Sequence, residues 1–381
     1  MTWSIDRIEK ELLSGPVSTI ALPSEMLAAA VNQVEQTLGA GWIESEISQV
    51  KGLSIAVRVI GMGLRLPAIE NLPRAEELIR NLRRRDQNAD AELTAIHLFR
   101  SMVPSPQLEL YPSVGQREAD FRIRESAQSH WTTVEVTQPM SSEERQRMDS
   151  LLRHLLSAFE KLGNPFSLDI LFRREPTDNE VEVLRNRLPE FCQLQGQQQA
   201  TLVGGLGFLF LNYAEIGRLA LLEVAELAET SMIGVTAFFS DPAGGGGPHH
   251  QVSIRIPFSD DRAERIIRTE AAQLPKEESG LIMIHESLSP RETPGWVSLI
   301  ERRFQPRIHT RVGGVCLFSG GMVPIGNQYG WLLQTRLLVN QHAKIQLPGW
   351  VKTAITRAGE EFERAFQALS AASTVERARS T

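Results

Sequence analysis

The stretch Arg117–Pro139, READFRIRESAQSHWTTVEVTQP, decides the predicted fold, because it holds two short strand-like runs separated by a polar turn. In each run apolar side chains share one face and a carboxylate lies on the other: Asp120 in the first run and Glu135 in the second. The apolar residues are Ala119, Phe121 and Ile123, and then Val134 and Val136. Because side chains alternate across a strand, both carboxylates are expected on the faces away from the packed side.

The elements around this stretch have a simple predicted order. A helix is expected over 91–102, with Glu92 on the same face as Ala95, Ile96 and Phe99, so that Glu92 points inward, where an unpaired charge is costly. Strands, a helix and a last strand follow. Their expected ranges are 107–112, 118–123 and 132–137 for the strands, 141–162 for the helix and 167–172 for the last strand. The predicted order is α-β-β-β-α-β, in an α/β protein.

This order, with Glu92 on the first helix, Asp120 on the second strand and Glu135 on the third, resembles the PD-(D/E)xK nuclease superfamily. The likeness is greatest to divergent branches in restriction and phage-defence enzymes, and it covers roughly residues 90–172. The resemblance implies a restriction-endonuclease-like core and an endonuclease that hydrolyses the nucleic-acid backbone with Mg²⁺ (or Mn²⁺). DNA rather than RNA is the expected substrate, and Glu92, Asp120 and Glu135 are the expected catalytic residues.

The residue chemistry leads to the same metal. Mg²⁺ prefers oxygen ligands, and two neighbouring strands would supply the carboxylates of Asp120 and Glu135 and the carbonyl of Val136. A bound cation would lower the pKa of a water molecule and offset charge on the scissile phosphate.

One position departs from the superfamily pattern, which has lysine two residues after the glutamate. Here Thr137 stands in that place and offers one neutral hydroxyl. Loss of one preorganised donor typically costs about a hundredfold to a thousandfold in rate. Arg145, near the start of the helix after the third strand, is the first candidate to replace the lysine. Gln138 is the second, provided that a bulge before Pro139 turns it toward the site.

The rest of the chain is assigned to flanking regions. The expected divisions are a mostly helical N-terminal region (1–85), the nuclease core (86–195), a C-terminal α/β lobe (196–350) and a C-terminal helix and tail (351–381). Trp296 and Trp331 are expected in the core, although either could stack on a base.

Composition limits the classes of protein. A formal net charge of −6 argues against a protein that coats nucleic acid through bulk positive charge, but not against a nuclease. The sequence has no long apolar run and no apolar secretory segment after its first residues, so we expect a cytoplasmic protein without a membrane partner. Two cysteines, Cys192 and Cys316, do not make a disulfide framework or a thiolate zinc site.

Two alternatives remain open. In one, the nuclease fold is catalytically inactive and serves as a scaffold that binds nucleic acid or a partner protein in an antiviral defence complex. In the other, the protein is a plain interaction protein, and Asp120 and Glu135 are surface residues paired with Arg122 and Arg124.

Overall fold

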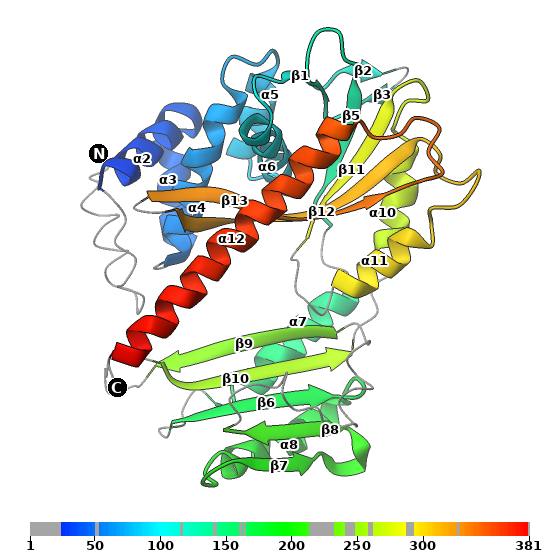
Figure 1. The fold of residues 1–381 in the computed structure, drawn as a ribbon. Coiled ribbons are helices and arrows are strands. Elements are labelled where there is room, and N and C mark those ends of the chain that lie inside the picture. The colour runs from blue at the N-terminus through cyan, green and yellow to red at the C-terminus, as the bar shows by residue number, and fades with distance from the viewer. Residues whose placement is uncertain are drawn as a thin grey trace. The chain divides into compact units, whose positions relative to one another are not determined.

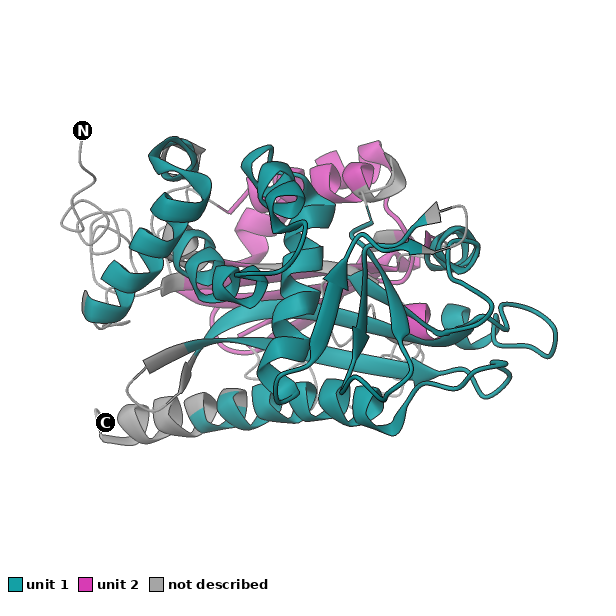
Figure 2. Ribbon diagram, turned by 90° about the horizontal axis from the view of Figure 1, so that it is seen from above, with its two compact units in different colours: residues 1–139, 263–288, 299–381 teal, residues 140–262, 289–298 magenta. Residues whose placement is uncertain are grey.

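Figure 1 shows the computed structural model of the chain, a mixed α/β protein with two larger sheets. The structure describes residues 24–49, 53–114, 117–139, 143–159, 162, 165–212, 232–240, 248–257, 262–286, 293–325 and 328–379. The chain divides into two compact units (Figure 2). Unit 1 contains residues 1–139, 263–288 and 299–381, and unit 2 contains residues 140–262 and 289–298.

This division differs from the expected boundaries at 85/86, 195/196 and 350/351. Unit 2 begins directly after the third strand of the predicted core, and the chain returns to unit 1 at residue 263. The helical N-terminal region and the C-terminal helix belong to the same unit as that strand, because their apolar side chains share one hydrophobic core.

The sheet of unit 1 has the strand order β1-β4-β5-β11-β12-β13. The bounds are β1 Gln107–Leu110, β4 Phe121–Arg124, β5 Thr132–Thr137, β11 Ser279–His285, β12 Val312–Ile325 and β13 Gln328–Val339. β4 is antiparallel to both β1 and β5, β11 is parallel to both β5 and β12, and β13 is antiparallel to β12. β11 is almost entirely buried, as its apolar sequence SGLIMIH predicts for a central strand.

The helices of unit 1 come largely from the two ends of the chain. They are α2 Ser24–Leu38, α3 Ala40–Gln49, α4 Leu53–Arg65, η1 Leu66–Ile69, α5 Ala75–Arg83, α6 Gln87–Met102, α10 Arg262–Ala271 and α12 Gly349–Arg379. α11 Thr293–Glu301 begins in unit 2 and ends in unit 1. A two-stranded hairpin, β2 Ser113–Val114 and β3 Arg117–Glu118, precedes β4. The side chains of α6 pack with those of β4 and β5 in one core, which includes Phe99, Phe121 and Val134.

Unit 2 contains a five-stranded sheet with the order β7-β8-β6-β10-β9. Its elements are α7 Glu143–Leu156, β6 Phe166–Phe172, α8 Asp178–Phe191, β7 Gln198–Thr201, η2 Val203–Gly205, β8 Gly207–Leu211, β9 Met232–Ser240 and β10 Pro248–Pro257. Thr177 and Glu180 form a capping box at the start of α8, as their spacing predicts. Unit 2 has its own apolar core, formed by α7, α8 and the sheet.

One part of the predicted core lies elsewhere. The helix expected at 141–162 and the strand expected at 167–172 exist as α7 and β6, but both belong to unit 2. β6 pairs with β8 and β10, and the neighbour of β5 is β11. Both β6 and β11 are short apolar runs suited to a central strand, so local sequence does not distinguish between them.

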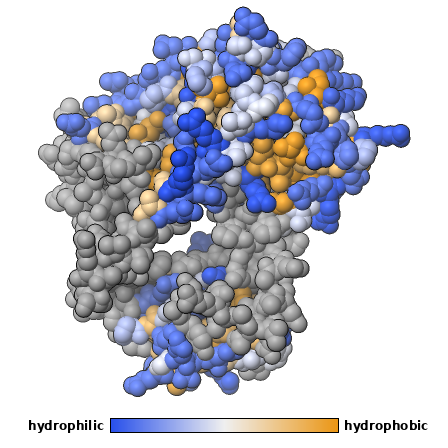
Figure 3. All heavy atoms as spheres, in the orientation of Figure 1, coloured by the Kyte–Doolittle hydropathy of each residue, from blue (hydrophilic) through white to orange (hydrophobic). Residues whose placement is uncertain are grey.

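On the face seen in Figure 3, hydrophilic side chains predominate among the described residues. The large apolar side chains that are exposed in the described part of the chain include Val183, Leu194, Ile308 and Ile345. None of the described helices combines the length and apolar character needed to cross a membrane.

Candidate functional site

Glu92 lies inside unit 1, as its place on the helix predicts. The side chain of Asp86 caps α6 by accepting hydrogen bonds from the backbone N–H groups of Asn88 and Ala89, at 2.8 and 3.3 Å. The residues on both sides of Glu92 are buried, and Glu92 itself is only 7% exposed. The fold therefore holds an acidic side chain in the apolar layer between α6 and the sheet.

Tyr111 is the partner of Glu92, and the sequence analysis did not find it. Its hydroxyl Oη donates to Glu92 Oε2 at 2.8 Å, and its backbone N–H donates to the carbonyl of Asp120 at 2.9 Å. Tyr111 has a φ of 49°, an uncommon conformation for a residue with a side chain. Its position after the apolar strand QLEL was a usable signal, because buried tyrosines usually direct their hydroxyl to a polar partner.

Asp120 and Glu135 face each other across two antiparallel strands. β4 pairs with β5 so that Phe121 lies opposite Val134, and continuing this register by one residue sets Asp120 opposite Glu135. Directly opposed side chains lie on the same face, with Cβ atoms about 4.5–5.5 Å apart. The spacing in the sequence thus translates into two adjacent carboxylates.

Backbone hydrogen bonds hold both carboxylates. The N–H of Val136 donates to Asp120 Oδ2 at 2.6 Å, and a hydrogen bond from the backbone of Asp120 reaches the carboxylate of Glu135. Each acid is thereby fixed by the strand that carries the other. One oxygen of Glu135, Oε1, is buried and has no hydrogen-bond partner. A buried polar atom without a partner is uncommon in native structures.

The electrostatics of these acids are unfavourable. Burial, above all, and the charge of Asp120 together raise the pKa of Glu92 to about 9. Burial raises the pKa of Glu135 to about 9 as well, with added contributions from the charges of Asp120, Glu270 and Glu92. Burial also raises the pKa of Asp120 to about 7, although the Val136 hydrogen bond acts in the opposite direction. Desolvation and mutual repulsion both disfavour the ionised forms.

Glu270, on α10, is a fourth acid that sequence reasoning missed. Burial raises its pKa, and its Oε2 accepts a hydrogen bond from Gln273 Nε2 at 2.6 Å. Its charge acts on both Asp120 and Glu135, so it lies near them. No local pattern marked it, because α10 follows β5 in the chain only after more than a hundred residues.

The donor set suits a hard divalent cation. Among the described residues, the charges that shift the pKa values of Asp120 and Glu135 come from acidic groups. A divalent cation would offset this repulsion and would give Glu135 Oε1 a partner. No group of three or more histidine, cysteine or acidic side chains in the described part of the chain is arranged to bind one ion. The candidate ligands are therefore a pair, Asp120 and Glu135.

The other predicted site residues have different positions. Val136 is buried, and its N–H rather than its carbonyl is the group with a described contact to the site. Thr137 is the last residue of β5, half-buried and paired with Ile284 of β11. The backbone N–H of Gln138 donates to Asn88 Oδ1 at 2.9 Å, and its side chain lines a cavity beside the start of α6. Arg145 lies on α7 in unit 2, and its side chain is outside the described residues.

No protein-family model matches this chain, and no curated protein matches its sequence significantly.

Proposed function

We propose that the protein is a nuclease that hydrolyses phosphodiester bonds of nucleic acid, DNA in the first place, with Mg²⁺ or Mn²⁺ held by Asp120 and Glu135. The observation that carries the proposal is the opposed pair of buried carboxylates, one oxygen of which has no partner. Two buried, ionised carboxylates repel each other when no ion lies between them, and their oxygens are the ligands that a divalent cation prefers.

The arrangement of unit 1 supports this proposal. Apart from the β2–β3 hairpin and the inserted unit 2, its elements α6, β1, β4, β5, α10 and β11 follow one another as α-β-β-β-α-β. Their strands lie in the sheet in chain order, with β5 and β11 parallel. This is the order on which the resemblance to PD-(D/E)xK nucleases rests, with α10 and β11 in place of the segments at 141–172.

The residues of this chain would divide the work as follows. Asp120 and Glu135 would ligate the cation, which when bound lowers the pKa of a water molecule and offsets phosphate charge. Tyr111 would orient Glu92 through its hydrogen bond, and Glu92 would hold a proton at the edge of the site, consistent with its raised pKa. Thr137, the last residue of β5, would offer a neutral hydroxyl where the superfamily has a lysine.

A cleavage assay with matched variants tests the proposal. Plasmid DNA and single-stranded DNA are incubated with Mg²⁺ or Mn²⁺ and wild type, Asp120→Asn, Glu135→Gln or the control Glu125→Gln, which changes an exposed acid in the turn after β4. We expect cleavage by wild type and the control, and a loss of at least about a hundredfold in both site variants. Mn²⁺ binding, measured by calorimetry, should weaken in the same two variants. Equal cleavage by all four proteins would refute the assignment.

A second function is favoured by one observation: the charges that act on the candidate site from described residues are acidic. A site without a cationic side chain lacks the group that usually faces the phosphate. In this alternative, the protein is a catalytically inactive scaffold that keeps the metal pair. Metal binding that Asp120→Asn abolishes, with no cleavage of DNA or RNA by wild type, would support the scaffold over the nuclease.

A further inference from the structure

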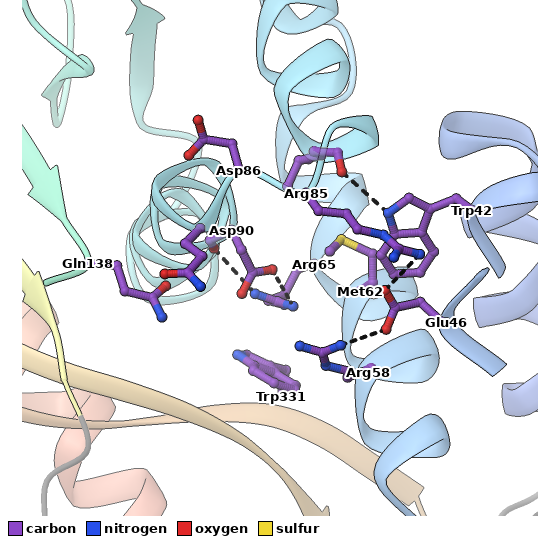
Figure 4. Close-up of a pocket in the computed structure, with 12 residues that line it drawn as sticks. Trp42, Glu46, Arg58, Met62, Arg65, Arg85, Asp86, Asp90, Gln138 and Trp331 are labelled. Carbon is purple, nitrogen blue, oxygen red and sulfur yellow. Dashed lines mark hydrogen bonds and ion pairs between the residues drawn. The ribbon is translucent and has the colours of Figure 1, made fainter. Parts of the chain in front are cut away.

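Unit 1 contains a cavity of about 370 Å³ beside the start of α6. This volume lies near the small end of the range of about 300–1,000 Å³ that is typical of small-molecule sites. The lining residues come from α3, α4, α5, α6, β13 and the turns around them (Figure 4). They are Trp42, Glu46, Arg58, Met62, Arg65, Leu82, Arg85, Asp86, Gln87, Asp90, Gln138 and Trp331. The cavity thus combines two tryptophans, three arginines, three acids and two amides.

The charges of the cavity are already balanced. Glu46 lies between two guanidinium groups, with Oε2 at 2.9 Å from Arg58 Nη1 and Oε1 at 3.2 Å from Arg85 Nη2. Arg65 Nη2 lies 3.0 Å from Asp90 Oδ1. The third acid, Asp86, caps α6. Three arginines and three carboxylates leave no formal excess of positive charge for a phosphate group.

The aromatic walls are fixed in place. The Trp42 ring nitrogen donates to the carbonyl of Leu82 at 3.3 Å, and the Arg65 guanidinium lies over the Trp331 ring at 4.3 Å. Gly61 and Gly320 approach the Trp331 ring so closely that a Cβ on either would lie 2.2 or 2.3 Å from a ring atom. Both rings are therefore held in place as walls of the cavity, so little ordering entropy is lost when a flat ligand enters it.

Gln138 adds a hydrogen-bonding edge. Its backbone is held by Asn88, and its side-chain amide, which contacts no described residue through a hydrogen bond, offers two donors and an acceptor. Gln138 follows Glu135 by three residues, about 10 Å along an extended chain. Gln138 thus connects the cavity to the end of the strand that carries Glu135.

We propose that this cavity binds a single nucleobase, presented by an unpaired position of the nucleic acid next to the cleaved bond. A base is flat, neutral and rimmed with donors and acceptors, which matches aromatic walls, balanced charge and the Gln138 amide. The identification of the ligand rests on the proposed function, since it takes the base from the nuclease substrate. The site accordingly favours single-stranded nucleic acid or an unstacked base over an intact duplex.

Calorimetric titration of the full-length protein with the common nucleoside monophosphates, and with ribose 5-phosphate as the phosphate control, tests the inference. Trp331→Leu removes one aromatic wall of the cavity. Gln87→Trp instead fills the cavity with a bulky ring from an exposed position, so it tests the site even if Trp331→Leu fails to fold. Trp131→Leu is the matched control, because Trp131 also stacks with arginines, Arg122 and Arg124, outside the cavity.

We expect at least one nucleotide to bind wild type and Trp131→Leu equally, and to bind the two cavity variants about 5- to 150-fold more weakly, the range of one stacked base. Binding of ribose 5-phosphate as strong as that of the nucleotides, unchanged binding in both cavity variants, or no nucleotide binding at millimolar concentration would overturn the inference. Nucleotide binding without any nucleic-acid cleavage would refute the nuclease and leave the base site standing. Cleavage that depends on Asp120, without nucleotide binding, would support the nuclease and refute the base site.

Discussion

Replacing Glu135 by glutamine should stabilise the metal-free protein increasingly as the pH rises. The substitution keeps the shape of the side chain and removes its ability to ionise. The pKa of Glu135 is raised from about 4.5 to about 9 by burial and by neighbouring acids. Folded wild type therefore holds a proton that the unfolded chain releases above about pH 4.5. The contribution of protonated Glu135 to the free energy of unfolding is therefore fully present below about pH 4.5 and is lost progressively as the pH rises to about 9.

The size of the effect follows from the same shift. Each pH unit between these limits lowers the free energy of unfolding of wild type by about 1.4 kcal/mol, which gives a loss of about 3 kcal/mol at pH 7. This figure is an upper limit, because Asp120, Glu270 and Glu92 share the repulsion and respond to the loss of one charge. For a domain of the size of unit 1, the limit corresponds to about 3–6 °C in Tm for each pH unit. The amide of glutamine, which lacks a partner for one of its polar atoms, adds a cost that does not depend on pH.

The assay is thermal unfolding followed by tryptophan fluorescence between about pH 5 and pH 8.5, first with a chelator and then with saturating Mg²⁺. With the chelator, the Tm of Glu135→Gln relative to wild type should rise with pH. With Mg²⁺, wild type should gain Tm and the variant should not, since a ligand that binds the folded state alone stabilises it. Glu125→Gln, at an exposed position, should follow wild type in both series. A difference between Glu135→Gln and wild type that does not change with pH would refute the reasoning on the buried acids.

Three further predictions test separate parts of the structure. Thr137→Lys restores the cation of the superfamily pattern and should raise the cleavage rate up to about a hundredfold in a plasmid assay; an unchanged rate would show that this position does not face the phosphate. Tyr111→Phe removes the donor to Glu92 and should cost about 1 kcal/mol in urea unfolding, whereas equal stability would show that the hydrogen bond contributes nothing. Gly63→Ala would place a Cβ 2.3 Å from the Ala30 carbonyl oxygen and should lower the free energy of unfolding by about 1–3 kcal/mol. Gly41→Ala, in open space on α3, should raise it by about 0.5–1 kcal/mol. A change of the same sign in both variants would contradict the packing.

The sequence predicted the local geometry of the site well. The pairing of β4 with β5 follows from two alternating runs separated by a short polar turn, and this pairing alone sets Asp120 opposite Glu135. The inward direction of Glu92 follows from its helix face. The alternation did not predict how deeply the two carboxylates are buried. Asp120 and Glu135 were expected on the outer face, yet Glu135 is 2% exposed, because β11, which pairs with β5, and α10, which carries Glu270, come from far along the chain.

The long-range partner of β5 could not be predicted, and the reason is physical. Two apolar strands, β6 and β11, both follow a helix and both satisfy the needs of a buried parallel strand. Chain proximity favoured β6, since nearby segments close smaller loops. The actual pairing with β11 depends on unit 2 folding around its own core, which no local pattern reveals. Glu270 was missed for the same reason, because it reaches the site only through that long connection.

The buried acids themselves argue for a bound cation. A folded domain is stable by only about 5–15 kcal/mol, and one carboxyl with a pKa near 9 removes a sizeable part of that at neutral pH. Amides in place of Asp120 and Glu135 would keep the shapes and most hydrogen bonds at lower cost. Packing and backbone hydrogen bonds therefore do not require negative charge at these positions. A divalent cation does require it, and it would turn the mutual repulsion of Asp120 and Glu135 into a shared attraction.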